Sequence, residues 1–494
     1  MKLKELANLL LIKDTNGDMN VEITGLEMDS RKITSGNLFI CVSGIDGFLE
    51  DRHQFVEDAV ENGAVALIVE RDINIEIPKI IVKDARYAMA VIASHFYGYP
   101  SNNKMKLIGI TGTNGKTTTS YLLEKILTDY GFQTGLMGNN GVKVGSKWYP
   151  TDINTQEPPI LQRNLQTMKN HNTDYCVMEI TSQGLHMERV KGCNFKTAIF
   201  TNLTQDHLDY HGTFEEYKHV KGLLFSRLGN DFSITDKKFA VLNTDDPSVE
   251  YFKKITSAEV ITYGIHNGAD VQAKNITLSP KGIRFLVSSF NGEIEINLNL
   301  VGHFNVYNAL AAITAALVEG IPLTNISDSL SDLKSIEGRM EIIDENQDFL
   351  VIVDYAHTPD ALENVLTTIS EFSKGKIITV FGCGGDRDAK KRPVMGEIAG
   401  SYSDFVYITS DNPRSEDPQA IMKDIEKGFS QNNNLNYKVE VDRELAINHA
   451  IHMASTNDIV LIAGKGHETY QILKDSTIHF DDKEIARQAI KNSR

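Results

Sequence analysis

The stretch KLIGITGTNGKTT, residues 106–118, runs from an apolar segment through a glycine-rich turn to a Lys-Thr pair. After it, leucine and isoleucine recur at helical spacing as far as Tyr130. A strand that passes through glycines into a helix presents free backbone N–H groups and the positive end of the helix dipole to one point, where an anion can bind. In such loops the lysine reaches the β- and γ-phosphates, and the next hydroxyl binds magnesium. We therefore predict an α/β domain that binds a nucleotide at this loop.

The loop is a variant of the general phosphate-binding pattern. That pattern has a glycine five positions before Gly115, where this chain has Ile110. An ordinary glycine turn is the alternative, but the strand, the Lys-Thr pair and the helix together favour phosphate binding. The candidate ATP-binding residues of the loop are Gly112, Thr113, Asn114, Gly115, Lys116, Thr117 and Thr118.

Patterns downstream of the loop predict a mostly parallel sheet. Strand patterns alternate with helical stretches there, as in α/β proteins. The strand candidates are 175–180, 197–203, 239–243 and 260–263. An Asn-Gly pair at 291–292 separates two alternating segments and predicts a hairpin. An alanine-rich helix is expected at 306–319.

A second α/β unit begins near Arg339. Its strand candidates are 350–353, 376–381, 405–409 and 459–463, and its helix candidates include 359–372 and 418–429. Upstream of the loop, Tyr99 to Asn103 is polar and contains a proline, which is typical of a linker.

The chain length agrees with three domains. At roughly 150 residues per domain, 494 residues suggest about three. We therefore expect an α/β protein with a small α/β N-terminal domain at 1–100, a central P-loop ATPase-like domain with a mostly parallel sheet at 101–335, and a C-terminal Rossmann-like α/β domain at 336–494.

The charge balance limits the classes of partner. Lys and Arg total 50 and Asp and Glu total 66, which gives a net charge of −16. A general nucleic-acid-binding protein normally has a basic surface, so we expect no nucleic-acid partner, whereas small anions can bind at local basic clusters. The four cysteines form no CxxC pair, and no apolar run is long enough for a membrane span. We expect a cytoplasmic protein with reduced thiols and no membrane insertion.

Three further positions are candidates for chemistry. Glu179 ends a strand candidate, where a carboxylate can face a bound metal, although a helix cap or a salt bridge is equally open. The segment 202–211 contains His207 and follows another strand, and ligands usually bind at the carboxyl edge of a parallel sheet. A structural role for this segment stays open as well. Lys221 lies on a helical stretch, and from the residues alone it reads as a surface lysine.

Four motifs occur in order at wide spacing: Gly112–Thr117, Thr201–His211, Gly302–Asn308 and Asp354–Pro359. Together they resemble the Mur ligases, ATP-dependent enzymes that form amide bonds in peptidoglycan precursor synthesis. The resemblance covers nearly the whole chain. It implies that an acceptor carboxylate attacks the γ-phosphate of ATP, that an acyl phosphate forms, and that an incoming amine then displaces phosphate.

The resemblance also implies roles around ATP. It assigns neutralisation of the phosphates to Lys116 and magnesium, with Thr117 as a metal ligand, and a second magnesium to Glu179 and His207. It implies that Lys221 is carbamylated by carbon dioxide and becomes another metal ligand. The implied cofactors are ATP, Mg²⁺ and carbon dioxide as the lysine carbamate. Other positions that match family contacts to ATP are Asn305, Asn308, Arg339, Asp354 and His357.

The resemblance extends to both other substrates. Asp411 to Arg414 matches the motif of the members that add meso-diaminopimelate, while lysine-adding members lack its arginine. A guanidinium can hold the second carboxylate of meso-diaminopimelate bidentately. The positions that match contacts to this amino acid are Arg387, Asp411, Asn412, Pro413, Arg414, Gly464 and Glu468. Those that match contacts to the acceptor, UDP-MurNAc-L-Ala-D-Glu, are Ser30, Asn154, Thr155, Thr181 and Arg189.

Two positions depart from the family pattern. Gln156 stands where the family usually has threonine, and Gln183 where it usually has histidine. Both changes fall on the acceptor side, so a sibling ligase with a different or modified acceptor, or with another diamino acid, is an alternative. A nucleotide-binding module without catalysis is a third hypothesis. The residues that argue against it are Lys116, Glu179, His207 and Lys221. We expect the protein to act as a monomer.

Overall fold

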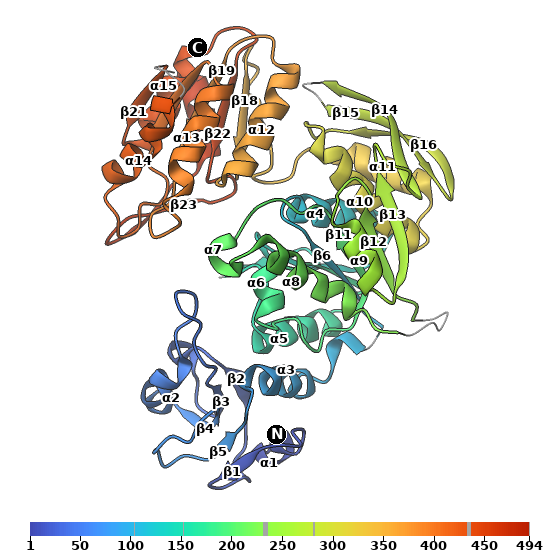
Figure 1. The fold of residues 1–494 in the computed structure, drawn as a ribbon, viewed down its shortest axis with the longest axis vertical. Coiled ribbons are helices and arrows are strands. Elements are labelled where there is room, and N and C mark those ends of the chain that lie inside the picture. Colours follow the sequence, from blue (N-terminus) through green and yellow to red (C-terminus); the bar gives the residue numbers. More distant parts are fainter. Residues whose placement is uncertain (103, 152, 231–235, 280–281, 432–435, 494) are drawn as a thin grey trace.

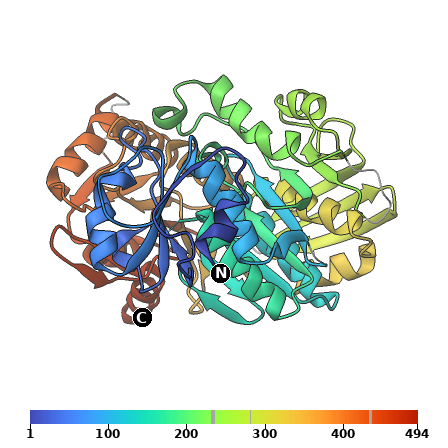
Figure 2. The ribbon, with the colours of Figure 1, turned by 90° about the horizontal axis from the view of Figure 1, so that it is seen from below.

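The computed structural model describes residues 1–102, 104–151, 153–230, 236–279, 282–431 and 436–493. These residues form three sheet-containing domains and a small hairpin (Figure 1). The N-terminal domain lies at one end of the long axis and the C-terminal domain at the other. Seen from below, the N-terminal domain stands in front of the C-terminal one (Figure 2). The expectation of a three-domain α/β protein is confirmed.

The N-terminal domain is built on a five-stranded sheet of order β1-β5-β4-β3-β2. Its apolar strands pack against helices on both faces and form two core clusters. The elements are α1 (Leu3–Ala7), β1 (Asp14–Asn16), β2 (Gly25–Glu27), the 3₁₀ turn η1 (Ser30–Lys32), β3 (Asn37–Ile40), η2 (Arg52–Phe55), α2 (Val56–Glu61), β4 (Ala64–Val69), β5 (Lys79–Ile81) and α3 (Ala85–Phe96).

The predicted linker is a packed connection. Pro100 to Asn102 forms a short 3₁₀ turn, η3 (Pro100–Asn102), in which Ser101 is buried. The Ser101 hydroxyl donates to Gly192 O at 3.3 Å and accepts from Asn194 N at 3.2 Å, so the turn is bonded to the central domain. Asn103 lies outside the described residues.

The central domain contains an eleven-stranded sheet of order β16-β15-β14-β13-β12-β11-β6-β10-β7-β8-β9. The strands from β14 to β7 in this order pair in parallel, and the strands at both edges are antiparallel. The strands are β6 (Lys106–Thr111), β7 (Thr134–Gly138), β8 (Gly141–Val144), β9 (Lys147–Tyr149), β10 (Tyr175–Glu179), β11 (Phe195–Phe200), β12 (Phe239–Asn243), β13 (Glu259–Gly264), β14 (Val271–Ser279), β15 (Gly282–Ser289) and β16 (Gly292–Leu298). The parallel core and the β15–β16 hairpin are as predicted, and the antiparallel extension β7-β8-β9 was not predicted.

Helices cover both faces of the central sheet. One core cluster joins the sheet to α4 and the alanine-rich α10, and another joins it to α5 and α8. The helices are α4 (Lys116–Asp129), α5 (Pro158–Asn170), α6 (Ser182–His186), α7 (Leu208–His211), α8 (Phe214–Ser226), α9 (Val249–Ile255), α10 (Phe304–Val318) and α11 (Leu323–Asp332). Because β6 is central in the sheet, the loop that follows it lies at the middle of the carboxyl edge.

The C-terminal domain has a six-stranded sheet of order β17-β18-β22-β19-β20-β21, parallel except for β17. Its two faces bury separate apolar clusters against helices. The elements are β17 (Glu341–Ile343), β18 (Leu350–Asp354), α12 (Pro359–Phe372), β19 (Ile377–Phe381), α13 (Lys391–Tyr402), β20 (Phe405–Thr409), α14 (Pro418–Gln431), β21 (Tyr437–Glu440), α15 (Arg443–Met453), β22 (Ile459–Ala463), the hairpin β23 (Tyr470–Ile472) and β24 (Thr477–His479), and α16 (Asp482–Asn492).

Candidate active site

The predicted phosphate loop lies between β6 and α4, and two of its glycines are required by close contacts. Gly115 caps α4 with φ of +86°, and a Cβ there would clash with the side-chain oxygen of Asn308. Gly112 has φ of +152°, and a Cβ there would clash with the Thr201 hydroxyl. Asn308 donates to Asn305 Oδ1 at 2.9 Å, so both predicted asparagines of α10 support the loop from one side.

The ammonium group of Lys116 lies over its own loop. Nζ donates to Gly112 O at 2.9 Å and to Thr113 O at 2.7 Å. Burial lowers the pKa of Lys116, while Glu179 and Asp206 counteract this shift. A phosphate group placed in the loop would supply the negative charge that the carbonyl groups lack.

Thr117 and Glu179 place two oxygen ligands beside the loop. The Thr117 hydroxyl donates to Glu179 Oε2 at 2.9 Å, and Asn139 N donates to Glu179 Oε1 at 3.2 Å. Magnesium is usually bound by one or two carboxylates together with substrate phosphates, so this pair fits a nucleotide-bound magnesium. Within the described residues, no group of three or more His, Cys, Asp or Glu side chains is arranged to hold a metal ion.

Lys221 is buried, contrary to its reading as a surface lysine from the residues alone. It lies on α8 with 1% of its surface exposed, and Nζ donates to Gly112 O at 2.8 Å. The ring of Tyr217 lies 4.6 Å from Nζ. Burial lowers the pKa of Lys221 far below its usual value, and the nearby Lys116 lowers it further. The amine therefore lies beside the phosphate loop with its neutral form favoured.

His207 stands at the start of α7 with φ of +53°, and its side chain is 44% exposed. Its Nε2 is 3.4 Å from Asp206 Oδ2. The Tyr217 ring lies 6.4 Å from the His207 ring, which places His207 on the same side of the loop as Lys221. The structure thus places His207 near the loop, but does not join it with Glu179 in one metal-binding cluster.

The C-terminal domain reaches the phosphate loop through Arg339. Its Nη2 donates to the Thr117 hydroxyl at 3.1 Å, and its guanidinium stacks over Tyr355 at 5.1 Å. Asp354 accepts from the backbone N–H groups of Met340 and Ala356 at 2.7 and 2.8 Å. Asp354 therefore orders the turns on either side of Arg339. The Nδ1 of His357 bonds the Tyr355 carbonyl at 2.7 Å.

Asp360 forms a second link between the two domains that sequence reasoning missed. Its Oδ2 accepts hydrogen bonds from Asn114 of the phosphate loop and from the Thr204 hydroxyl. Asp360 follows Pro359 in the first turn of α12, where a carboxylate also interacts favourably with the helix dipole. The family motif Asp354–Pro359 ends one residue before Asp360, so the motif did not include it.

Replacing Asp360 with alanine is expected to lower kcat by about 10-fold, because hydrogen bonds to a charged group contribute roughly 1.5–3 kcal/mol and here join the domains that share the site. Glu371, exposed near the end of the same helix, offers Glu371→Ala as the matched control. Steady-state rates of phosphate release would measure both. Equal rates for the two variants would show that the link has no role in turnover.

The predicted acceptor contacts form a network at the end of β10. The Thr155 hydroxyl donates to Glu179 O at 3.1 Å and accepts from Thr181 N at 2.9 Å. Arg189 donates to Thr155 O at 3.2 Å and to Glu157 Oε1 at 2.8 Å. Asn154 directly precedes this network. The network of Thr155, Thr181 and Arg189 therefore lies next to Glu179, whose carboxylate bonds Thr117 of the phosphate loop.

Both glutamines that depart from the family pattern are in this region. Gln156 is buried, donates to the Thr151 hydroxyl at 2.9 Å and accepts from Asn164 at 2.7 Å. Gln183 accepts from the Ser182 hydroxyl at 3.2 Å. Ser30, by contrast, lies in η1 of the N-terminal domain, where it is buried and its carbonyl accepts from Asn62.

Two arginines of the C-terminal domain lie together against Gly384. Arg414, with φ of +52°, donates from Nη1 to Gly385 O at 2.8 Å, and Arg387 donates to Asp386 O at 3.0 Å. A Cβ on Gly384 would lie 2.9 Å from Arg414 Nη1 and 3.8 Å from Arg387 Cγ. Desolvation and the neighbouring Arg414 lower the pKa of Arg387. Two adjacent guanidinium groups favour an anionic ligand.

A carboxylate cluster lies beside these arginines. Asn412 donates from Nδ2 to Glu468 Oε2 at 2.9 Å, and Asp411 packs against Gly464. Pro413 joins the cluster to Arg414, and the Arg414 N–H bonds Ile472 O at 3.1 Å. The structure therefore brings together all seven residues predicted to bind the amino acid.

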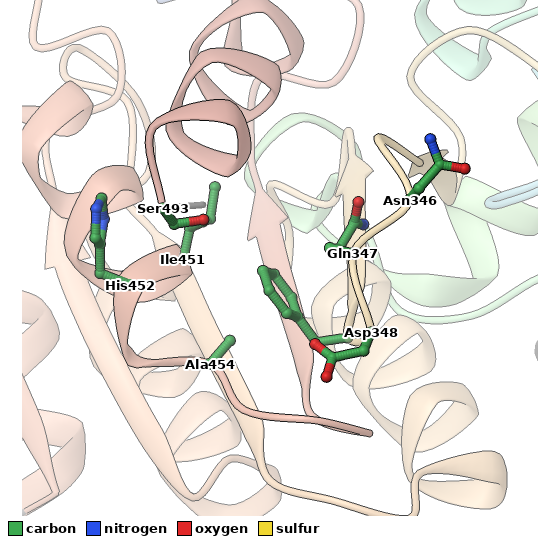
Figure 3. A pocket seen from close by; sticks show the side chains of 8 residues that line it. Asn346, Gln347, Asp348, Ile451, His452, Ala454 and Ser493 are labelled. Atoms are coloured by element: carbon green, nitrogen blue, oxygen red, sulfur yellow. The ribbon is translucent and has the colours of Figure 1, made fainter.

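A cavity of about 500 Å³ lies elsewhere in the C-terminal domain (Figure 3). It is lined by residues 346–349, by the end of α15 and by Ser493. Among its polar lining groups, the Gln347 amide is already bonded to the backbone, since it donates to Ile343 O and accepts from Glu345 N. None of the predicted site residues lines it.

Comparison with known proteins agrees with the motifs. Residues 22–97 match the Mur ligase family, catalytic domain; residues 110–316 match the Mur ligase middle domain; and residues 338–466 match the Mur ligase, glutamate ligase domain. Within the described residues, no helix has both the length and the apolar character needed to cross a membrane.

The chain is similar over nearly its full length to proteins named UDP-N-acetylmuramoyl-L-alanyl-D-glutamate--2,6-diaminopimelate ligase. That of Geobacillus thermodenitrificans (strain NG80-2) is 49% identical over 96% of each chain, and that of Listeria innocua serovar 6a is 44% identical over 99% of each. A solved structure with the same name is 33% identical, covers 100% of this chain and 99% of its own, and has a TM-score of 0.68. The MurF ligase of Thermotoga maritima in complex with ADP, at 18% identity, shares the fold over 97% of this chain and 98% of its own, with a TM-score of 0.64.

Proposed function

Because this chain belongs to the Mur ligase family, we propose that it is the ATP-dependent ligase that joins meso-2,6-diaminopimelate to the D-Glu γ-carboxylate of UDP-MurNAc-L-Ala-D-Glu in peptidoglycan precursor synthesis. The observation that carries the choice of amino acid is the arrangement of Arg387 and Arg414 beside the Glu468 cluster. This arrangement offers a carboxylate-binding group and an ammonium-binding group in one part of the domain, although they are far apart in the sequence. Meso-diaminopimelate has both groups at its second amino-acid centre, and lysine has only the ammonium group.

The proposed reaction has two steps on one carboxylate. The acceptor carboxylate attacks the γ-phosphorus of ATP, the bond to the β-phosphate oxygen breaks, and ADP leaves. The amine then attacks the acyl carbon of the acyl phosphate, loses a proton and expels phosphate. In both steps the protein positions anions and neutralises their charge. Lys116 and the loop N–H groups hold the phosphates, and Arg339 adds a cation from the other domain.

Magnesium, when bound at Thr117 and Glu179, would supply positive charge to the phosphate oxygens. We propose that Lys221 supplies a further anionic ligand after its neutral amine reacts with carbon dioxide. In that reaction the nitrogen bonds to the carbon of carbon dioxide and loses a proton, which leaves a carbamate. The burial that lowers the Lys221 pKa favours the neutral amine that this reaction needs. We place His207 beside this carbamate as a further ligand.

The three domains would then divide the work. We propose that the N-terminal domain, 1–100, holds the UDP-sugar near Ser30, that 101–335 binds ATP, and that 336–494 binds the amino acid. We propose that the enzyme acts as a monomer. A cytoplasmic location is proposed because ATP and the nucleotide-linked acceptor are substrates.

A sibling ligase with the same chemistry and another acceptor is the second candidate. It is favoured by Gln156 and Gln183, which replace the usual residues next to the Thr155 network. Gln156 is buried and fully bonded within the protein, which supports a structural role there.

An assay panel tests both candidates. Phosphate release is measured with UDP-MurNAc-L-Ala-D-Glu or a modified acceptor, each combined with meso-diaminopimelate, L-lysine or no amino acid. We expect release to need ATP, UDP-MurNAc-L-Ala-D-Glu and meso-diaminopimelate together. Release only with the modified acceptor would establish the sibling ligase, and release only with L-lysine would refute the proposed role of Arg414.

A further inference from the structure

Lys465 is a buried cation to which the proposed mechanism assigns no role. Its side chain is 0% exposed, and it lies in the turn after β22 between two glycines. Gly464 has φ of +118°, and a Cβ there would lie 2.6 Å from Asp411 Oδ2. Gly466 has φ of +55°, and a Cβ there would lie 2.7 Å from the Tyr355 Cβ. The backbone around Lys465 is therefore fixed on both sides.

The ammonium group of Lys465 contacts the amino-acid cluster directly. Nζ donates to Asn412 Oδ1 at 3.0 Å and to Glu468 Oε2 at 3.4 Å, and it lies 4.0 Å from Asp411 Oδ1. Asn412 also donates to Glu468 Oε2 at 2.9 Å. Two donors therefore converge on one oxygen of Glu468. Its other oxygen, Oε1, accepts one long hydrogen bond, from the Tyr355 hydroxyl at 3.5 Å.

The charges of Asp411, Glu468 and Lys465 do not balance, and one more cation would neutralise them. Asp411 and Glu468 carry two negative charges, and Lys465 carries one positive charge. Arg443 is also close, but it is paired with Asp482 through two bonds of 2.8 and 2.7 Å, both side chains being fully buried. The cluster therefore has a net charge of −1, which an ammonium group would neutralise.

We propose that Lys465 is a positioning residue for the amino-acid substrate: it holds Glu468 Oε2, so that Oε1 receives the ammonium group of the substrate's second amino-acid centre. This inference rests on the proposed function. Arg387 and Arg414 would bind the carboxylate of the same centre. Lys465 thus acts through Glu468 and does not touch the substrate.

The ionisation of Glu468 supports this role. Burial raises the pKa of Glu468, and the Lys465 ammonium and the Asn412 amide oppose that rise. Asp411 acts in the same direction as burial. The Tyr470 ring also lies near, 5.8 Å from Lys465 Nζ. Removing the Lys465 charge would therefore raise the Glu468 pKa further. As the pH falls, the Glu468 carboxylate would then be protonated at a higher pH than in the wild type. The protonated form binds the substrate's ammonium group less well.

Lys465→Met tests the inference in the full-length enzyme. We expect the KM for meso-diaminopimelate to rise roughly 30-fold, as expected when one partner of a buried charged hydrogen bond is removed. The KM for ATP should change less than about 2-fold, because Lys465 contacts no residue of the phosphate loop. The rise in KM should be larger at pH 6.5 than at pH 8.5. Lys427→Met, on exposed Lys427 of α14, is the control, and Lys465→Gln serves if the methionine variant does not fold.

A double-mutant cycle decides between positioning and a purely structural role. If Lys465 acts through Glu468, adding Lys465→Met to Glu468→Gln should change the KM for meso-diaminopimelate less than about 3-fold further. If the double variant instead raises the KM by the product of the two single effects, the inference is wrong. An unchanged KM in both Lys465 variants would also overturn it. A wild-type enzyme that releases no phosphate with meso-diaminopimelate would instead refute the proposed function.

Discussion

Replacing Lys116 with alanine is expected to lower kcat by about 10³-fold or more. The reaction places ATP and two carboxylate-bearing substrates in one site, and its catalysis rests mainly on neutralising their charge. Lys116 lies at the start of α4 with its ammonium over the loop carbonyls of Gly112 and Thr113. Alanine removes this cation but keeps the helix, because alanine has the highest helix propensity. Phosphate release with all three substrates measures the effect.

Lys125→Ala is the matched control for this change. Lys125 lies on the same helix, is 25% exposed and pairs with Asp129 at 2.7 Å. Its replacement should leave kcat within about 2-fold, since a partly exposed ion pair between neighbouring turns of one helix contributes little to stability and, within the described residues, contacts no loop carbonyl. A folded Lys116→Ala enzyme that kept the wild-type rate would show that the loop does not bind the reacting phosphates.

Replacing Lys221 with alanine is expected to lower kcat by about 10²–10³-fold, the loss typical of removing one electrostatic contact to the reacting groups. The uncharged amine that attacks carbon dioxide is scarce in an ordinary lysine near pH 7.5, about one part in a thousand at a pKa near 10.4. Burial lowers the pKa of Lys221 and so raises that fraction at the same pH. Wild-type protein in ¹³C-bicarbonate should therefore show a carbamate signal by NMR.

If Lys221→Ala loses both the carbamate signal and the catalytic rate, Lys221 is the modified residue. Lys218→Ala is the control, because Lys218 is on the same helix and pairs with Glu215 near the surface. The signal should weaken as the pH falls, since protonation removes the reactive amine. A carbamate signal that persists in Lys221→Ala, or an unchanged rate in that variant, would contradict the assignment.

The sequence predicted the architecture because its strands are apolar runs broken by clear turns. The loop at 106–118, the hairpin at 291–292 and most parallel strands of both large sheets appear where expected, whereas the parallel strands β7, β14 and β21 were not predicted. Strand β9 was missed because Lys147 to Tyr149 is only three residues long and all three are exposed. Such a strand has no alternating pattern to detect.

Site residues could be predicted from the sequence only where they lie in a recognisable motif. Lys221 read as a surface lysine until the family resemblance was considered, and its burial is visible only once α8 is docked on the sheet. Asp360 and Asn114 are 246 positions apart, so no local pattern connects them. Nothing in the sequence around Lys465 indicates burial, whereas the fold leaves its side chain fully buried, with the Tyr470 ring 5.8 Å from Nζ.

The hydroxyl of Thr117 is shared by groups from two domains. It donates to Glu179 and accepts from Arg339, while the same oxygen is the proposed magnesium ligand. A hydroxyl oxygen has two lone pairs, so a magnesium ion could bind there beside the Arg339 contact and would place two positive charges close together. The negative phosphate groups of the nucleotide would then have to lie between these charges. The contact that joins the C-terminal domain to the loop would thus depend on whether nucleotide is bound.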